Sequence, residues 1–324
     1  MNKYTNKQYN QAISLKKQGL GSLRISKILK IKNRNVVEGW INKGRKPRKS
    51  SHNLQTIKKI RKIKKDSPEI SYLVGLLNGD GHLQIERNRD GKITNGLISF
   101  YSKNIREINI IIKKFKKLFG IKGTIYKDER GGNVRYKLFF HSYYLAEFLE
   151  SMGVVRGNKC IQKHLVPSWI MKGKKEVKAA FLRGIYSAEG SITKFRQKNS
   201  FRYRGELVCS KIENLRKNCI GYMVEIKSLV GGFDIKCSNV TFQGESKKRK
   251  DGRCTHKFRF TFEKRYFDKF YKFVGFDNEH RQLRLKEALN KGSVPKRSRE
   301  SPAERSFAGS KLNENPARPL FLLK

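Results

Sequence analysis

The chain contains an internal repeat, and no other feature of the sequence constrains its fold as strongly. The stretch YKLFFHSYYLAEFLESMGV at 136–154 aligns without a gap with FRFTFEKRYFDKFYKFVGF at 258–276. The stretch SKNIREINIIIKKF at 102–115 aligns in the same way with SKIENLRKNCIGYM at 210–223. Two related halves in one chain predict a monomer that is built like a symmetric dimer.

Apolar periodicity and turn residues predict the same order of elements in both halves: helix, two strands, helix, two strands, helix. The first repeat covers residues 70–153 and the second covers residues 174–292, with a connector at 154–173. One strand of the second repeat is expected near 233–242. The expected fold class is therefore α+β, with two αββαββα repeats.

Each half opens with an apolar helix that ends in an acidic residue followed by glycine. These helix ends read LVGLLNGDG (73–81), which contains Asp80, and LRGIYSAEG (182–190), which contains Glu189. A carboxylate in the last turn of a helix is disfavoured by up to about 1 kcal/mol, because the helix dipole is negative there. The placement costs stability in both halves, so it indicates a function.

Small residues occur four positions apart on both of these helices. They are Gly75 and Gly79 on the first helix, and Gly184 and Ala188 on the second. A stripe of small residues lets two helix backbones approach more closely than usual. We therefore expect the two helices to pack against each other, with their acidic ends side by side.

Two adjacent carboxylates repel each other unless cations lie between them. A pair of divalent metal ions suits in-line displacement at phosphorus, because one ion activates water and the other stabilises the leaving oxygen. The expected metal ligands are Asp80 and Glu189.

The charge of the chain is one-sided and indicates a polyanionic partner. Lys and Arg number 74 against 27 acids among 324 residues, a formal charge of +47. Nucleic acid is the expected partner rather than a membrane, because no apolar run approaches the roughly 20 residues that span a bilayer. The five scattered cysteines include no C-x-x-C pair, which favours reduced thiols in an intracellular protein over a zinc site.

Residues 1–42 are expected to form three short helices around a small core that includes Leu23 and Ile28. The spacing suits a helix-turn-helix unit, whose third helix would present Arg34 and Asn35 to a major groove. A three-helix bundle without DNA contacts is the alternative.

Residues 43–69 are expected to be a basic linker. Its start would place Arg45 and Arg48 in a minor groove, although a solvated basic tether fits the same residues. At the other end of the chain, residues 293–324 hold four of the seven prolines, and we expect this tail to be disordered.

The two nonamers resemble the paired motifs of monomeric LAGLIDADG homing endonucleases, and the resemblance covers about residues 70–292. The connector sequence HLVPSWI also resembles that of the family. The chain departs from the motif at its first acidic letter, where it has Asn78 and Ser187. The second acidic letter, which carries the metal in the family, is kept as Asp80 and Glu189.

The resemblance implies that each half contributes four strands to a saddle that lies along the major groove of DNA. Arg and Gln side chains on such strands can pair with two atoms of guanine or adenine. The expected DNA-facing residues of the two repeats are Gln84, Glu86, Asn88, Arg135, Lys137, Lys194, Arg196, Arg202, Arg204, Lys257 and Arg259. A solvated strand face is the alternative for any one of them.

Basic residues at the ends of the second strands orient solvent around the metals in the family. Lys103 and Lys211 occupy equivalent positions of this kind, and salt bridging is their alternative role. The expected metal is Mg²⁺, with Mn²⁺ as a substitute.

These features predict an intron-encoded, site-specific endonuclease that makes a double-strand break in a long DNA target of about 20 bp. It would act as a monomer in the cytoplasm or nucleoid of a prokaryote, or in an organelle. One alternative is a maturase that uses the same fold on its host intron RNA. Another is a DNA-binding regulator without catalysis, which would not need the two acids.

Overall fold

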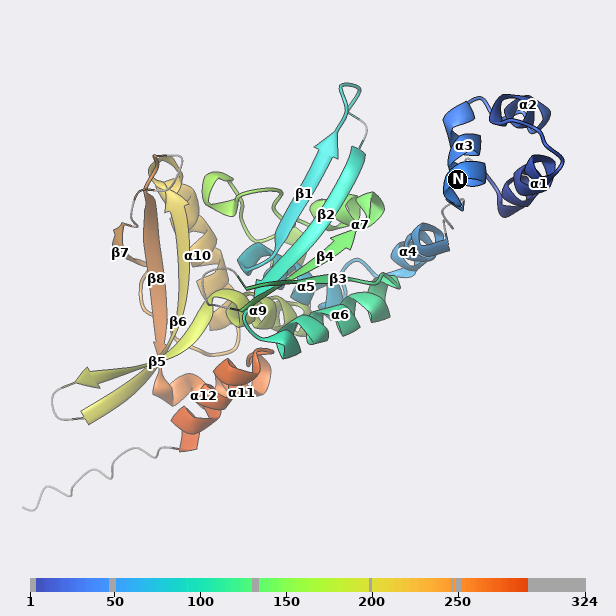
Figure 1. Cartoon of the computed structure of the whole chain (residues 1–324). Helices are drawn as coiled ribbons and strands as arrows, with labels where there is room; N and C mark the ends of the chain where they lie inside the picture. Colours follow the sequence, from blue (N-terminus) through green and yellow to red (C-terminus); the bar gives the residue numbers. More distant parts are fainter. Residues whose placement is uncertain are drawn as a thin grey trace, which may run out of the picture. The chain divides into compact units, whose positions relative to one another are not determined.

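The computed structural model of the chain describes residues 4–46, 51–91, 93–129, 134–197, 200–245, 248 and 252–290 (Figure 1). Arg48 and the tail at 293–324, for which we predicted a DNA contact and disorder, lie outside the described residues. No helix in the described ranges is long and apolar enough to cross a membrane.

The N-terminal part is a unit of three helices with its own small core. The helices are α1 (Asn6–Lys17), α2 (Ser22–Ile28) and α3 (Arg34–Lys43). Thr5 and Gln8 form a capping box at the start of α1, and the Asn33 side chain accepts a hydrogen bond from Asn35 N at the start of α3. The buried core consists of Ala12, Ile25, Ile31, Val37 and Trp40.

Two residues that we placed in this core are on the surface. Leu23 is 51% exposed and Ile28 is 54% exposed, whereas Ile31 is buried. The chain leaves α2 through Lys30, which has a positive φ of 52°. Ile31 N then donates to Ser26 O, and this turn carries Ile31 into the core in place of Ile28.

The segment that we predicted as a linker contains a helix, α4 (Ser51–Lys62). Ile60 and Ile63 pack against the main core, and the Lys59 ammonium donates to Lys117 O at 3.0 Å. The many lysines of this segment led to the linker prediction. Its isoleucines, however, occur at a spacing of three and give the helix an apolar side. Part of the linker is therefore docked on the first repeat.

The first repeat has a four-stranded antiparallel sheet with the strand order β1-β2-β4-β3. Its elements are α5 (Pro68–Gly79), β1 (His82–Arg87), β2 (Ile93–Ser102), α6 (Ile105–Phe119), β3 (Thr124–Asp128), β4 (Arg135–His141) and α7 (Tyr143–Ser151).

The second repeat has the same topology, with the strand order β5-β6-β8-β7. Its elements are α9 (Lys175–Glu189), β5 (Gly190–Gln197), β6 (Ser200–Ile212), η3 (Glu213–Leu215), α10 (Arg216–Gly231), β7 (Thr241–Glu245), β8 (Thr255–Glu263), η4 (Lys264–Tyr266) and α11 (Phe267–Phe273). The connector contains η2 (Lys159–Ile161) and α8 (Ser168–Met171), and α12 (Glu279–Asn290) follows the second repeat. The expected α+β fold with two αββαββα repeats is confirmed.

One expected strand is much shorter than predicted. The strand expected near 233–242 begins only at Thr241. Asp234 has a positive φ of 57°, which turns the chain after α10 and prevents an extended strand there.

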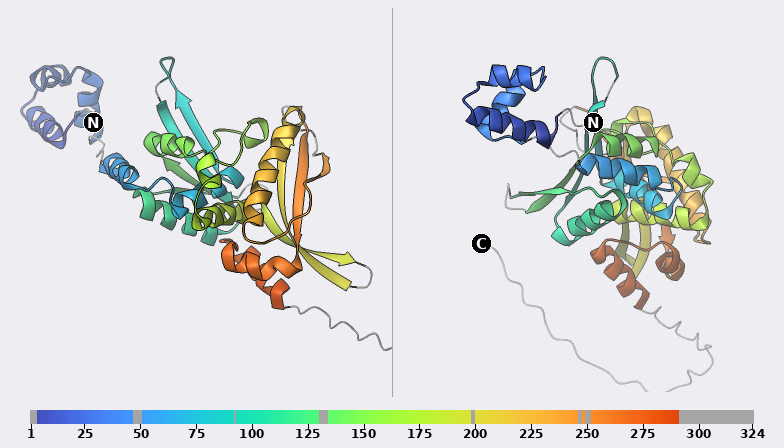
Figure 2. Two further views of the ribbon diagram at one scale, coloured as in Figure 1. Left: turned by 180° about the vertical axis from the view of Figure 1, so that it is seen from behind. Right: turned by 90° about the vertical axis from the view of Figure 1, so that its right-hand side faces the viewer.

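Each sheet buries one face under helices. Phe140 of β4 and Phe262 of β8, which the repeat aligns with each other, are both buried in the main core. In the second repeat, α10 covers the apolar face of the sheet (Figure 2). The opposite faces carry polar and charged side chains and are available for binding.

Candidate active site at the ends of two paired helices

Helices α5 and α9 touch through their backbones. A Cβ atom added to Gly75 would lie 3.0 Å from Ile185 N and closer still to Phe181 O. A Cβ added to Gly184 would lie 2.7 Å from Leu76 N. Only glycine allows this approach, because any side chain at these positions would push the two helices apart.

The contact continues to the C-terminal ends of both helices. A Cβ added to Gly79 would overlap the Ala188 methyl group and lie 3.4 Å from Glu189 Cγ. The four small residues that we singled out thus line one helix contact, and Asp80 and Glu189 come from adjacent helix ends.

The two carboxylates lie at the surface, yet the surrounding protein raises the pKa of both. Burial raises the pKa of Asp80, and the positive charges of Arg281 and Lys159 partly offset this increase. Burial raises the pKa of Glu189 as well, and the charge of Asp80 raises it further. Both side chains still reach solvent. A partner at the surface can therefore contact them.

A cation caps the end of each helix. The Lys159 ammonium, from η2 in the connector, donates to Leu77 O at 3.1 Å, to Gly81 O at 2.7 Å and to Gly79 O. It thereby satisfies carbonyl groups that have no partner at the end of a helix, and it opposes the helix dipole.

Arg281 of α12 caps the second helix in the same manner. Its Nη1 donates to Tyr186 O at 3.1 Å, to Ala188 O at 2.6 Å and to Ser187 O. Our sequence reasoning missed both cations. The ungapped alignment that pairs Gly153 with Gly275 also pairs Lys159 with Arg281, so extending it by a few residues would have found them.

The residues at the first acidic letter of each motif have matching structural roles. Asn78 Oδ1 accepts from Val155 N at 2.9 Å, and Ser187 Oγ accepts from Asp277 N at 2.7 Å. The repeat alignment pairs these two backbone groups with each other. A neutral hydrogen-bonding side chain at this letter therefore ties each helix end to the segment that follows the last helix of its own repeat.

Lys103 and Lys211 are equivalent in sequence but not in surroundings. Lys103 is exposed, beyond the end of β2. Lys211 is 1% exposed, and its ammonium contacts Lys159 O, Gln162 O and His164 Nδ1. Burial lowers the pKa of Lys211. The Lys211 ammonium is bound to these connector groups and holds the connector in place. Exposed Lys103 can therefore reach a substrate, whereas Lys211 cannot.

The carboxylate pair fits the protein's share of a magnesium site. Mg²⁺ is usually bound by one or two carboxylates, with water and substrate phosphates as its other ligands. No further His, Cys, Asp or Glu in the described ranges joins the pair to make a group of three that could hold a metal ion. The remaining ligands would have to be water and phosphate oxygens.

The exposed face of the first sheet carries four of the predicted DNA-facing residues. Gln84 and Glu86 alternate with buried Leu83 and Ile85 along β1, and Gln84 Nε2 donates to Glu86 Oε1 at 3.0 Å. The strand pairing brings Arg135 and Lys137 of β4 to this same face. Asn88 lies past the end of β1.

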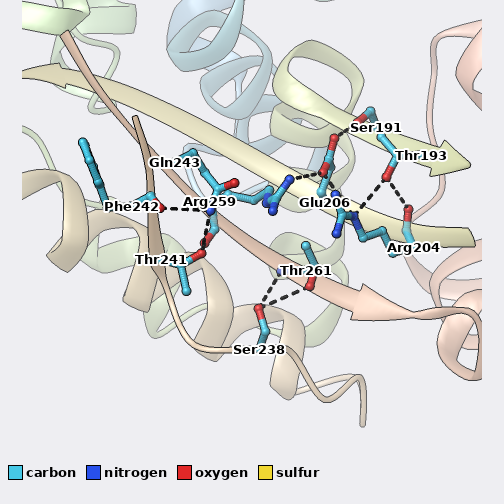
Figure 3. A network of polar contacts seen from close by, with 10 residues as sticks. All are labelled: Ser191, Thr193, Arg204, Glu206, Ser238, Thr241, Phe242, Gln243, Arg259 and Thr261. Atoms are coloured by element: carbon cyan, nitrogen blue, oxygen red, sulfur yellow. Dashed lines mark hydrogen bonds and ion pairs between the residues drawn. The ribbon is translucent and has the colours of Figure 1, made fainter. Parts of the chain in front are cut away.

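The exposed face of the second sheet carries an organised polar network (Figure 3). Glu206 accepts from Arg259 at 3.3 Å and from Ser191 at 2.9 Å, and lies 3.7 Å from Arg204 Nε. Two of the predicted DNA-facing arginines are thus held in fixed positions by one carboxylate. Arg202 and Lys257 lie on this face as well.

Lys194 and Arg196 do not share this face, which corrects our prediction. Thr193 pairs with Arg204, whereas Lys194 pairs with Tyr203 and Arg196 with Phe201. Paired residues of an antiparallel sheet lie on the same side, so Lys194 and Arg196 point to the opposite side from Arg204. Near its tip the hairpin consists of β5 and β6 alone, beyond the end of β8 (Figure 1).

In the N-terminal unit, Arg34 and Asn35 are exposed at the start of α3. Arg34 Nε donates to Ser22 Oγ at 3.1 Å, which ties α3 to α2. Arg45 is also exposed, just beyond the end of α3.

The chain is similar to known proteins over part of its length. The profile of the family described as LAGLIDADG-like domain matches residues 67–153. The chain is 29% identical over 190 residues to the tRNA-splicing ligase RtcB of Pyrococcus abyssi, covering 55% of this chain and 19% of that protein. It is 30% identical over 203 residues to the replication factor C small subunit of Methanocaldococcus jannaschii, covering 56% and 10%. The chain thus spans a fifth or less of these relatives.

Solved structures that are similar to the chain include two homing endonucleases and a DUF199/WhiA protein. The homing endonuclease I-WcaI bound to its DNA recognition sequence has a TM-score of 0.43 and 15% identity, over 72% of this chain and 91% of that one. I-DmoI in complex with DNA and Mn has a TM-score of 0.40 and 17% identity, over 64% and 97%. Full-length DUF199/WhiA from Thermatoga maritima has a TM-score of 0.36 and 15% identity, over 69% and 59%. From the family profile and the repeated fold, we conclude that this chain contains a LAGLIDADG-like domain, formed by residues 67–153.

Proposed function

We propose that the protein is a site-specific DNA endonuclease that makes a double-strand break by metal-dependent hydrolysis. One observation carries this proposal. Asp80 and Glu189 come from equivalent ends of two tightly packed helices, and each helix leads directly into the sheet of its own repeat. An active centre related by a pseudo-twofold axis suits a substrate with two antiparallel strands.

The chemistry would follow from the carboxylate pair. Divalent metal ions, Mg²⁺ or Mn²⁺, would activate water and stabilise the leaving oxygen when bound. Asp80 and Glu189 would hold them, and the glycine contact between α5 and α9 would keep the two carboxylates at a constant separation. Lys103 is exposed and could reach solvent or phosphate at the first half of the site.

The two exposed sheet faces would bind the duplex. Arg135 and Lys137 on the first sheet, and Arg202 and Lys257 on the second, would contact bases or phosphates. Arg204 and Arg259 are held by Glu206, so they would meet DNA in a preformed geometry. Arg34, Asn35 and Arg45 of the N-terminal unit would extend the contact on one flank.

The activities named for the relatives differ from one another, which supports a different role for this chain. A ligase, a replication factor and, over 74% of this chain, a glutamine–fructose-6-phosphate aminotransferase share no chemistry by name. Each is matched over a fifth or less of its length. We therefore assign none of those activities to this chain.

One observation favours a second candidate function, a DNA-binding regulator without catalysis. Lys159 and Arg281 already offset part of the charge of the two carboxylates within the protein. Such a protein would use the sheets and the N-terminal unit for binding alone.

A cleavage assay separates the two candidates. The protein would be incubated with duplex DNA that joins the two sequences flanking its gene, and with duplexes selected by binding from a randomised pool. We expect a cut in both strands with Mg²⁺ or Mn²⁺ and none with EDTA. Asp80→Asn should bind the same duplex without cutting it. Specific binding with no cleavage under any divalent metal would refute the endonuclease and support the regulator.

A further inference from the structure

The two helix-capping cations lie where a metal ion would otherwise be attracted. Carbonyl oxygens at the end of a helix carry partial negative charge, and here they lie next to carboxylates. Such a group of oxygens is an attractive site for a hard divalent cation. In this chain the oxygens of Gly79 and Ala188 already accept hydrogen bonds from Lys159 and Arg281.

The same two cations also act on the carboxylates themselves. Lys159 Nζ donates to Gly79 O and Gly81 O, which flank Asp80, and Arg281 Nη1 donates to Ala188 O, next to Glu189. Each carboxylate therefore has a positive side chain bound to the backbone beside it. These positive charges offset those of the two carboxylates and reduce the protein's own attraction for a divalent ion, although Glu107 adds a further negative charge near Asp80.

A purely structural explanation accounts less well for the pair. The repeat alignment makes Lys159 and Arg281 equivalent, although one lies in the connector and the other on α12. Lysine and arginine differ in shape and in hydrogen-bond geometry. What the two repeats share at this position is a positive charge directed at two equivalent carbonyl groups, those of Leu77 and Gly79 on one helix and those of Tyr186 and Ala188 on the other.

We propose that Lys159 and Arg281 are resident counter-ions that exclude divalent metal from the Asp80–Glu189 pair until the phosphates of DNA arrive. The inference rests on the proposed metal site of the endonuclease. Phosphate oxygens would supply the missing negative charge and the missing ligands, so that metal binds on the DNA side of the carboxylates. Metal binding is then coupled to substrate binding, and the two positioning residues are what couples them.

The test measures Mn²⁺ binding to the full chain without DNA, at low salt, by the electron paramagnetic resonance of free Mn²⁺. Lys159→Gln and Arg281→Gln remove one charge each and keep an N–H donor for the carbonyl groups. A single charge a few ångströms away shifts proton binding by roughly one to three logarithmic units. We therefore expect each variant to bind Mn²⁺ at least about tenfold more tightly than the parent.

Two sets of control variants identify the cause. Lys159→Arg and Arg281→Lys keep the charge and should bind Mn²⁺ as weakly as the parent does. Adding Asp80→Asn to either glutamine variant should abolish the gain, because it removes one of the carboxylates. Thermal unfolding with and without Mn²⁺ provides an independent readout, in which Mn²⁺ should raise the Tm of the glutamine variants and not that of the parent.

The outcomes are distinct from those of the cleavage assay. Glutamine variants that bind Mn²⁺ no better than the parent would overturn the inference, even if the parent cuts DNA. Equal tightening in the charge-preserving variants would overturn it too, because looser packing would then be the cause. Tighter binding in the neutral variants alone would support it, even if the parent proved to cut no DNA.

Discussion

The backbone contact between α5 and α9 predicts that adding one methyl group at Gly184 is costly. The Cβ of Gly184→Ala would lie 2.7 Å from Leu76 N, whereas ordinary contacts begin at 3.4 Å. Tyr72 O would be closer still, so the two backbones would have to separate by more than about 0.7 Å, because neither can move like a flexible side chain. Such overpacking typically costs about 1–3 kcal/mol, against a gain of about 0.5–1 kcal/mol from replacing a helical glycine.

The expected net loss is about 0–2.5 kcal/mol, with a midpoint near 1 kcal/mol. Each kcal/mol lowers the Tm by at most roughly 2–4 °C, the range for chains of about 150–250 residues. The cleavage rate should also fall, and by a larger factor than the lost stability alone would cause. Glu189 follows Gly184 by about one turn on α9, and about 1 Å of misplacement of a catalytic group can cost about a hundredfold in rate. The measurements are calorimetry without metal and single-turnover cleavage.

Gly221→Ala on α10 is the matched control. Its added Cβ would lie 3.6 Å from Leu165 Cδ2, an ordinary contact, so this variant should melt at or above the parent's Tm. The reasoning is refuted if Gly184→Ala melts like Gly221→Ala, since the helices would then not be in backbone contact.

Two further predictions concern other parts of the molecule. Deleting residues 1–46 should weaken DNA binding and reduce the slope of log K against log[salt] by about 0.9 for each phosphate that the N-terminal unit neutralises, with the cut position unchanged; a shifted cut would show that this unit sets the register. Burial and the neighbouring Lys211 charge lower the pKa of His164 from 6.5 to about 3. The unfolded chain therefore binds the extra proton first, and His164 should reduce stability progressively as the pH falls from about 6.5 to 3. His164→Asn, whose amide oxygen can still accept from Lys211, should lose less stability over that range in denaturant titrations; an unchanged pH dependence would contradict the neutral state of His164 in the folded protein.

The sequence by itself determined the repeat, the order of elements in both halves and the paired helices. These features are visible because they recur as local patterns: apolar periodicity, small residues four apart, and an acid at a helix end. The alternation of Phe258, Phe260 and Phe262 with charged residues likewise predicts which face of β8 is buried, because the period of a strand is two.

Only the tertiary structure decided which distant groups meet. Lys159 and Arg281 cap helices that lie far from them in sequence, and Lys211 is occupied by connector carbonyls while its equivalent Lys103 remains exposed. Lys194 carries the charge expected of a DNA contact, yet the register of β5 against β6 turns it to the other side of the sheet. The secondary structure and the buried face of an element can be predicted from local patterns in the sequence. The contacts of long side chains and the registers of hairpins depend instead on packing between segments that the sequence does not place side by side.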